Sequence, residues 1–184
     1  LWAFLGGMRG VAITDALQGA LMLIIALAAL VWSGVKFKGL DIQSFPNAFW
    51  TPVRFINLTL PWIFFALNNP QVMQRLFIPK DRKAFNRMIL YFGLFGLFYT
   101  LSVTLIGFAA RYGMGRGVFP DVADRDKVIL EVMARMGQWL AMPVALSIMF
   151  AAVTTANSII LTLSSMVVRD LFREKGKIWI GKIF

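Results

Sequence analysis

Uncharged, mainly apolar residues fill four long runs of the chain, at about 16–35, 55–74, 88–110 and 136–168. Each run can cross a hydrocarbon layer about 30 Å thick, which takes about 20 residues of α-helix. The runs are continuously apolar and do not alternate between polar and apolar positions, which argues against the strands of a membrane barrel. The pattern therefore predicts an all-α integral membrane protein in a lipid bilayer.

The residues that flank these runs set the limits of the predicted helices. We expect membrane spans over about 8–33, 54–77, 84–111 and 137–168, with a short amphipathic helix ahead of the last span. Together they form a single transmembrane domain over residues 1–184. Because the chain begins with Leu1 and not with Met, we expect it to be an internal fragment of a longer protein.

Composition agrees with this assignment and excludes several kinds of chemistry. Of the 184 residues, 59% are hydrophobic and 15% are charged, and a soluble domain carries more charge than this. Cysteine and histidine are absent, which removes disulfides, thiolate nucleophiles, histidine bases and the usual zinc sites. We therefore expect that the protein is not an enzyme.

Basic residues predict the orientation of the chain in the membrane. A net charge of +10 is also typical of nucleic-acid-binding proteins, but here the basic residues flank apolar spans, so we expect no nucleic-acid partner. They are densest in the 75–87 loop and in the C-terminal tail after Val168. This distribution predicts a multi-pass protein of the cell membrane in which that loop and the tail are cytoplasmic.

The second span, 54–77, contains residues that interrupt a helix. Pro61 lies inside it, and Asn68 and Asn69 precede Pro70, whose ring removes a backbone donor and clashes with the preceding turn. A helix that is broken near residues 68–70 at membrane depth must face protein or a watery cavity, and such breaks mark substrate and ion sites in transporters. The alternative is a simple proline kink.

Asp15 is the only acidic residue that lies against one of the apolar runs. It follows Gly7 by eight residues, or roughly 12 Å of helix. A carboxylate at the centre of a membrane costs about 2.5–3.5 kcal/mol on insertion scales, so it needs a partner or a function. The alternative is an interfacial carboxylate that reaches lipid headgroups or caps a nearby helix.

A stripe of small and hydroxyl-bearing residues follows one face of the last span. It consists of Ala151, Thr154, Thr155, Ser158, Thr162 and Ser165, at spacings that place them on one side of a helix. Close helix packing, or hydroxyls bonded to carbonyls of the preceding turn, would explain it. The functional alternative is a site for a hard cation such as Na⁺, with oxygen ligands from two adjacent hydroxyls and a carbonyl one turn earlier.

Three stretches together are similar to a known family. "GGMRGVAITDALQG" (6–19), "NPQVMQRLFIPKDRKA" (69–84) and "AAVTTANSIILTLSS" (151–165) resemble, in order and spacing, three signature regions of the sodium:solute symporter family. Within the family the chain looks most like the pantothenate and proline symporters. Those relatives usually have Ser-Thr at Thr154-Thr155, a change that keeps both hydroxyls.

The resemblance implies a LeuT-like transporter fold built from two inverted five-helix repeats. This chain would hold the end of core helix four and all of core helices five to eight. The broken second span would be core helix six, and the fourth span would be core helix eight. The partners of the chain would then be the remaining helices of the full-length protein, the lipid bilayer and a small-molecule substrate.

The resemblance also implies ion ligands. The coupling ion of the family, Na⁺, lies between core helices one and eight, and the matching ligands here are the Ala151 carbonyl and the hydroxyls of Thr154 and Thr155. Core helix one, which would supply the other ligands, is not in this sequence. Asp15, Asn157 and Ser158 match positions that are linked in some relatives to a second ion or to ion release.

The substrate-binding candidates are Trp62, Phe65, Asn68 and Asn69. Trp62 matches a tryptophan that lines the substrate site of the proline symporter, although a packing role fits it equally well. Sugar transporters place a tyrosine at the position of Phe65 and an asparagine at that of Trp62, and the loss of both polar contacts argues against a sugar. An amino acid, a vitamin or another small organic acid fits this wall better.

The sequence thus predicts a sodium-coupled symporter that imports a small organic solute by alternating access. The alternative is a membrane sensor domain of the same fold, coupled to a signalling module. An intramembrane enzyme is disfavoured, because Asp15 stands alone and histidine is absent.

Overall fold

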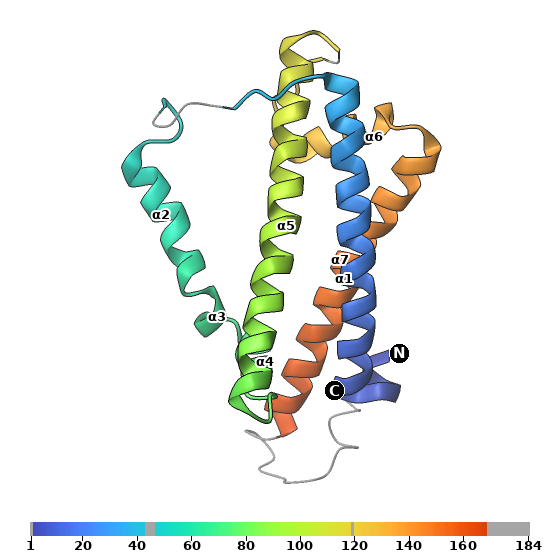
Figure 1. The fold of residues 1–184 in the computed structure, drawn as a ribbon. Helices are drawn as coiled ribbons and strands as arrows, with labels where there is room; N and C mark the ends of the chain where they lie inside the picture. Colours follow the sequence, from blue (N-terminus) through green and yellow to red (C-terminus); the bar gives the residue numbers. More distant parts are fainter. Residues whose placement is uncertain (1, 43–46, 119, 169–184) are drawn as a thin grey trace.

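The computed structural model describes residues 2–42, 47–118 and 120–168. Within these ranges the chain is entirely helical and has no strand, as the sequence predicts (Figure 1). The elements in chain order are α1 (Trp2–Phe37), α2 (Pro52–Ile63), α3 (Phe65–Asn68), α4 (Pro70–Leu76), α5 (Arg82–Gly115), the 3₁₀ turn η1 (Arg125–Lys127), α6 (Val128–Arg135) and α7 (Gln138–Met166).

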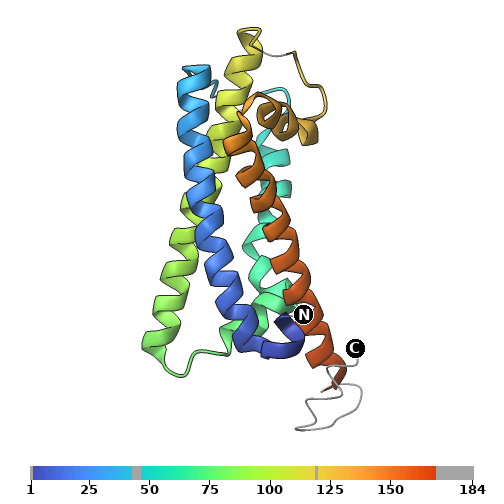
Figure 2. The same cartoon turned by 90° about the vertical axis from the view of Figure 1, so that its right-hand side faces the viewer.

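Three of the described helices are long and apolar enough to cross a membrane, in agreement with a multi-pass membrane protein. They are Arg9–Phe37 within α1, all of α5 and all of α7. The predicted spans 8–33, 84–111 and 137–168 fall on these helices, although α1 begins earlier and ends later than predicted. The helices form an elongated bundle in which α1 packs against both α5 and α7 (Figure 2).

The second predicted span is not one helix with a single break. The expected break occurs at Asn69, where the backbone is extended, and a further break that the sequence analysis missed occurs at Phe64. Every side chain from 52 to 65 is exposed, so no tertiary packing within the described chain holds α2 and α3 in one straight helix. Helices in proteins owe most of their stability to such packing, and Pro61 already removes one internal hydrogen bond.

Small residues form the contact between α1 and α5. Ala29 on α1 and Ala109 and Ala110 on α5 are 3%, 0% and 0% exposed, and they belong to one apolar cluster. The amphipathic helix α6 closes this cluster with Val132, which is fully buried. Small side chains allow helix backbones to approach closely in a membrane, where packing replaces the hydrophobic effect as the main attraction.

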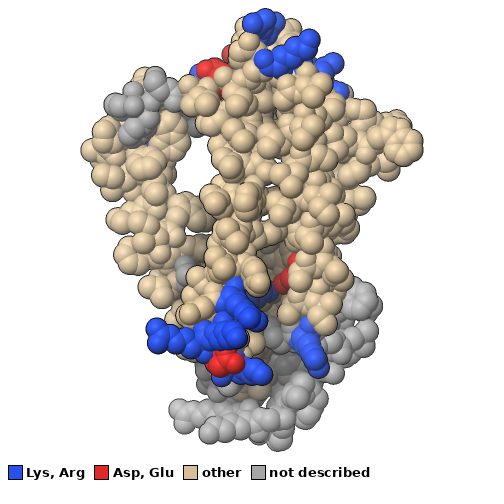
Figure 3. All heavy atoms as spheres, viewed as in Figure 1, with Lys and Arg blue, Asp and Glu red and all other residues tan. Residues whose placement is uncertain are grey.

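The two ends of the bundle carry different elements. The 77–81 loop lies at the same end as the first turns of α1 and the last turn of α7, opposite α6 and the loop after α1 (Figure 1). Basic side chains gather around the 77–81 loop, where Lys80, Arg82, Lys83 and Arg87 are exposed, and a second basic group lies at the far end (Figure 3). The cytoplasmic location of the 75–87 loop stays a prediction, and the tail lies outside the described residues.

Asp81 caps the first turn of α5, and this cap provides a stability test. Its Oδ1 accepts a hydrogen bond from the Ala84 backbone N–H at 2.7 Å. Asp81→Ala should lower the free energy of unfolding of the full-length protein by about 1 kcal/mol, because a helix N-cap is lost. Thermal unfolding in detergent measures the change. Asp81→Asn keeps the acceptor and should stay near wild type; equal losses in both variants would contradict the cap as the cause.

Candidate functional site

A cavity of about 240 Å³ lies beside α4, between α1, α5 and α7. It is lined by Asp15, Gly19 and Met22 of α1, Gln71, Val72 and Arg75 of α4, Phe95 of α5, and Thr154, Thr155 and Ser158 of α7. The structure therefore brings Asp15 together with three members of the predicted stripe, from segments that are more than 130 residues apart in the sequence.

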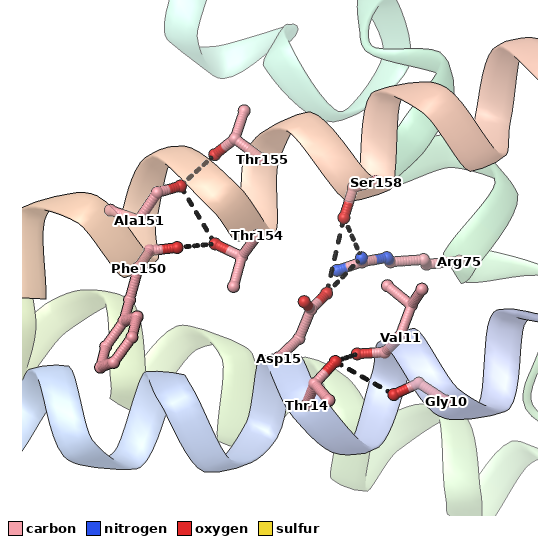
Figure 4. A network of polar contacts seen from close by, with 10 residues as sticks. All are labelled: Gly10, Val11, Thr14, Asp15, Arg75, Phe150, Ala151, Thr154, Thr155 and Ser158. Carbon is pink, nitrogen blue, oxygen red and sulfur yellow. Dashed lines mark hydrogen bonds and ion pairs between the residues drawn. The ribbon is translucent and has the colours of Figure 1, made fainter. Parts of the chain in front are cut away.

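A polar network joins three helices at this cavity (Figure 4). Arg75 Nη2 donates to Asp15 Oδ2 at 2.7 Å and to Ser158 Oγ at 2.6 Å. Ser158 Oγ also lies 3.5 Å from Asp15 Oδ2. The side chains of Asp15 and Arg75 are 18% and 42% exposed. Asp15 is thus an ion-paired carboxylate that joins α1 to α4 and lies beside α7.

The second oxygen of Asp15 is in a different situation. Oδ1 is buried and has no hydrogen-bond partner among the described residues. A buried carboxylate oxygen without a donor is unfavourable, so it marks a place where a donor or a cation would be stabilised. The ion pair with Arg75 therefore satisfies only half of this carboxylate.

The hydroxyls of Thr154 and Thr155 turn back onto their own helix. Thr154 Oγ1 lies 3.0 Å from both the Phe150 and the Ala151 carbonyl oxygens, and Thr155 Oγ1 donates to the Ala151 carbonyl at 2.8 Å. This is the local bonding that the sequence analysis gave as one explanation of the stripe. It also draws the oxygens of Ala151, Thr154 and Thr155 into one group at the cavity.

That group fits a monovalent hard cation. Each hydroxyl donates its proton to a carbonyl and keeps its oxygen lone pairs free to accept. Three neutral oxygens supply part of a coordination shell without a carboxylate, which suits an ion that must also leave. No group of three or more His, Cys, Asp or Glu side chains that could hold a metal ion exists among the described residues.

The second group of predicted ion residues is only partly assembled. Asp15 and Ser158 meet through Arg75, as described above. Asn157 is half-buried on α7 and is not among the described residues that line the cavity. Its assignment to an ion path stays a prediction.

The predicted substrate residues lie elsewhere in the described chain. The rings of Trp62 and Phe65 are 5.5 Å apart, and the two residues are 69% and 41% exposed. Asn68 is exposed, and Asn69 is half-buried with no side-chain hydrogen bond that caps α4. None of the four lines the cavity between α1, α4, α5 and α7, as far as the described residues define it, so the structure does not bring them to the ion candidates.

A larger cavity of about 910 Å³ lies beside α6. Its walls are mainly apolar, and its charged members include Asp41 and Arg111, which form an ion pair with 2.8 Å between Oδ2 and Nε. No predicted site residue belongs to its described lining. The smaller cavity, which contains the polar network, is therefore the candidate site.

Sequence reasoning missed the role of Arg75, which it counted with the bases of the 75–87 loop. Arg75 in fact lies inside α4, and four residues without charge, 76–79, separate it from Lys80, the next basic residue. Two features of the sequence could have indicated Arg75 as the partner of Asp15: its separation from the other basic residues, and the need of Asp15 for a partner of opposite charge. Gln74 was missed as well: its Nε2 donates to Ser165 Oγ at 3.0 Å and ties α4 to α7 a second time.

Comparisons with known proteins agree with the resemblance seen in the sequence. The model of the sodium:solute symporter family matches residues 1–177. The chain is 27% identical over 192 residues to the sodium/pantothenate symporter of Haemophilus influenzae, and the match covers 94% of this chain and 38% of that relative. The chain thus spans well under half of the length of this relative. No solved structure matches the chain.

Proposed function

Because the chain belongs to the sodium:solute symporter family, we propose that it is part of a sodium-coupled symporter that imports a small organic solute across the cell membrane. The observation that supports this most directly is the group of oxygens on Ala151, Thr154 and Thr155 beside a cavity that Asp15 also lines. The proposal includes the LeuT-like arrangement, in which helices outside this chain complete the ion site.

In the proposed cycle, Na⁺ is a transported substrate. It binds the Ala151 carbonyl and the hydroxyls of Thr154 and Thr155, and leaves past Asp15 and Ser158, which line the cavity, and past Asn157 beside them on α7. An ion can drive a conformational change only if it binds one state more tightly than the other. An inside-negative membrane potential adds roughly 2.3 kcal/mol per ion for each 100 mV.

The organic substrate is proposed to bind near the break at Asn69. Trp62 and Phe65 offer aromatic surface there, and Asn68 and Asn69 offer amide groups next to an interrupted helix. The named relative is a sodium/pantothenate symporter, so pantothenate is the first compound to test, followed by proline and other small organic acids. The 75–87 loop and the C-terminal tail are proposed to face the cytoplasm.

Uptake by the full-length protein in vesicles tests this function. An inward Na⁺ gradient should accelerate the entry of radiolabelled pantothenate or proline relative to equimolar K⁺. A potential of 100 mV, inside negative, should raise accumulation about fiftyfold for each coupled charge. A proton gradient in Na⁺-free buffer is the control. Uptake that is equally fast in K⁺ and Na⁺, or that follows only the proton gradient, would contradict the proposal.

A further inference from the structure

The cavity between α1, α4, α5 and α7 is lined by two charged side chains of opposite sign, Asp15 and Arg75, among the described residues. Thr154 and Thr155, whose hydroxyls are the proposed sodium ligands, line the same cavity. A cation at those oxygens is therefore attracted by Asp15 and repelled by Arg75. Interactions between charges that share one partly buried cavity are stronger than in water, because the effective dielectric constant there is lower.

Arg75 cannot lose its charge under physiological conditions, since a guanidinium stays protonated in proteins. Its 2.7 Å contact with Asp15 can be broken only by a movement of the side chain or of α4. The electrostatic environment of the neighbouring oxygens therefore depends on the position of this short helix.

The position of α4 is defined by contacts with α7 as well as with α1. Gln74 binds Ser165, and Arg75 binds Ser158, so two consecutive residues hold α4 against α7. On its other side α4 is separated from α3 by the extended residue Asn69. Side-chain bonds and one extended residue therefore determine the position of α4, and separation of Arg75 from Asp15 requires that the bond from Arg75 to Ser158 break as well.

We propose that Arg75 is a mobile counter-ion that makes the sodium affinity of the Thr154–Thr155 site depend on the conformation of the transporter. With Arg75 on Asp15, as here, the carboxylate is neutralised, and sodium binds weakly enough to leave. When α4 carries Arg75 away, the carboxylate with its unpartnered Oδ1 raises the affinity for sodium. This inference rests on the proposed function, because it assigns a regulator to the same ion site.

Binding of radiolabelled Na⁺ to the purified full-length protein tests the inference without knowledge of the organic substrate. Arg75→Gln should lower the half-saturating Na⁺ concentration about tenfold, which corresponds to about 1.4 kcal/mol. Arg75→Lys keeps the charge and should stay within about threefold of wild type. Asp15→Asn leaves Arg75 without its counter-ion and should raise the half-saturating concentration about tenfold.

The double variant Asp15→Asn/Arg75→Gln separates charge from structure. It removes both charges and should return the half-saturating concentration to within about threefold of wild type. Gln74→Ala is the matched control, because it removes the neighbouring tie between α4 and α7 without changing any charge; its Na⁺ affinity should be unchanged. The comparison of Asp15→Asn with the double variant remains informative even if Arg75→Gln alone does not fold.

Two different failures can be distinguished. The first failure concerns Arg75 alone. Wild type would bind Na⁺ saturably, but the half-saturating Na⁺ concentration would not fall in Arg75→Gln, or would not return to the wild-type value in the double variant. Either result would overturn the role of Arg75 and leave the sodium site in place. A similar change in Gln74→Ala and Arg75→Gln would show that Arg75 is only a structural tie. Absence of saturable Na⁺ binding in wild type would overturn the proposed function itself.

Discussion

Replacement of both Thr154 and Thr155 by valine should abolish sodium-driven uptake by the full-length transporter. Valine keeps the branched shape of threonine and removes the hydroxyl, so the helix packing of α7 is preserved. In the structure both hydroxyl oxygens lie within 3.0 Å of the Ala151 carbonyl oxygen. In the double variant this carbonyl would be the one oxygen of the three that remains. Interactions of a charge with a polar group contribute roughly 1.5–3 kcal/mol each. The two losses together therefore raise the half-saturating Na⁺ concentration at least about a hundredfold.

The initial rate of uptake as a function of Na⁺ concentration measures this effect. Thr162→Val is the matched control, because Thr162 is 6% exposed on the same helix and is not among the described residues of the cavity. It should lose stability at most and keep its dependence on sodium. If the double variant and Thr162→Val behaved alike, the hydroxyl stripe would be explained by packing and the sodium assignment would be wrong.

Replacement of Ala109 by leucine should lower the stability and the folded yield of the full-length protein. Ala109 has no exposed surface, and its cluster joins α5 to Ala29 of α1 and Val132 of α6. Three further carbon atoms would have to displace these neighbours, and overpacking of this kind costs about 1–3 kcal/mol. A loss of about 2 kcal/mol changes the ratio of folded to unfolded protein roughly thirtyfold.

The yield of monodisperse full-length protein and its thermal unfolding in detergent report this change. Ala109→Ser adds only one oxygen, which can bond a carbonyl of the preceding helical turn, and it should remain close to wild type. A leucine variant as stable as the serine variant would mean that α1 and α5 can separate at this point, contrary to the tight contact described here.

The long helices could be predicted from the sequence because their signal is local. An uncharged run of about 20 residues is long enough to cross a membrane as one helix, and α1, α5 and α7 fall on three of the four predicted spans. The break at Asn69 was also predictable, because Pro70 restricts the residue before it. The break at Phe64 was not, since it depends on the absence of neighbours against α2 and α3 in the described chain.

The site was predictable only where its residues share one helix. Thr154 and Thr155 stand out by helical spacing, and Asp15 stands out by the cost of an acid near a membrane span. The contact of Asp15 with Arg75 joins residues 60 positions apart, and the bond from Arg75 to Ser158 joins residues 83 apart. No periodicity relates positions on three different helices, so the partner of Asp15 required the structure.

Asn69 also determines how the segment 54–77 can move. The chain after it is fastened to α1 and α7, whereas the twelve residues of α2 lie free of the bundle in the described chain. The far end of α2, at Pro52, precedes Asn69 by 17 residues. At 1.5 Å per residue this arm is at most about 25 Å long, so a rotation of about 10° at Asn69 displaces Pro52 by up to about 4 Å. α2 can therefore change its position while the hydrogen bonds of Gln74 and Arg75 on α4 stay intact.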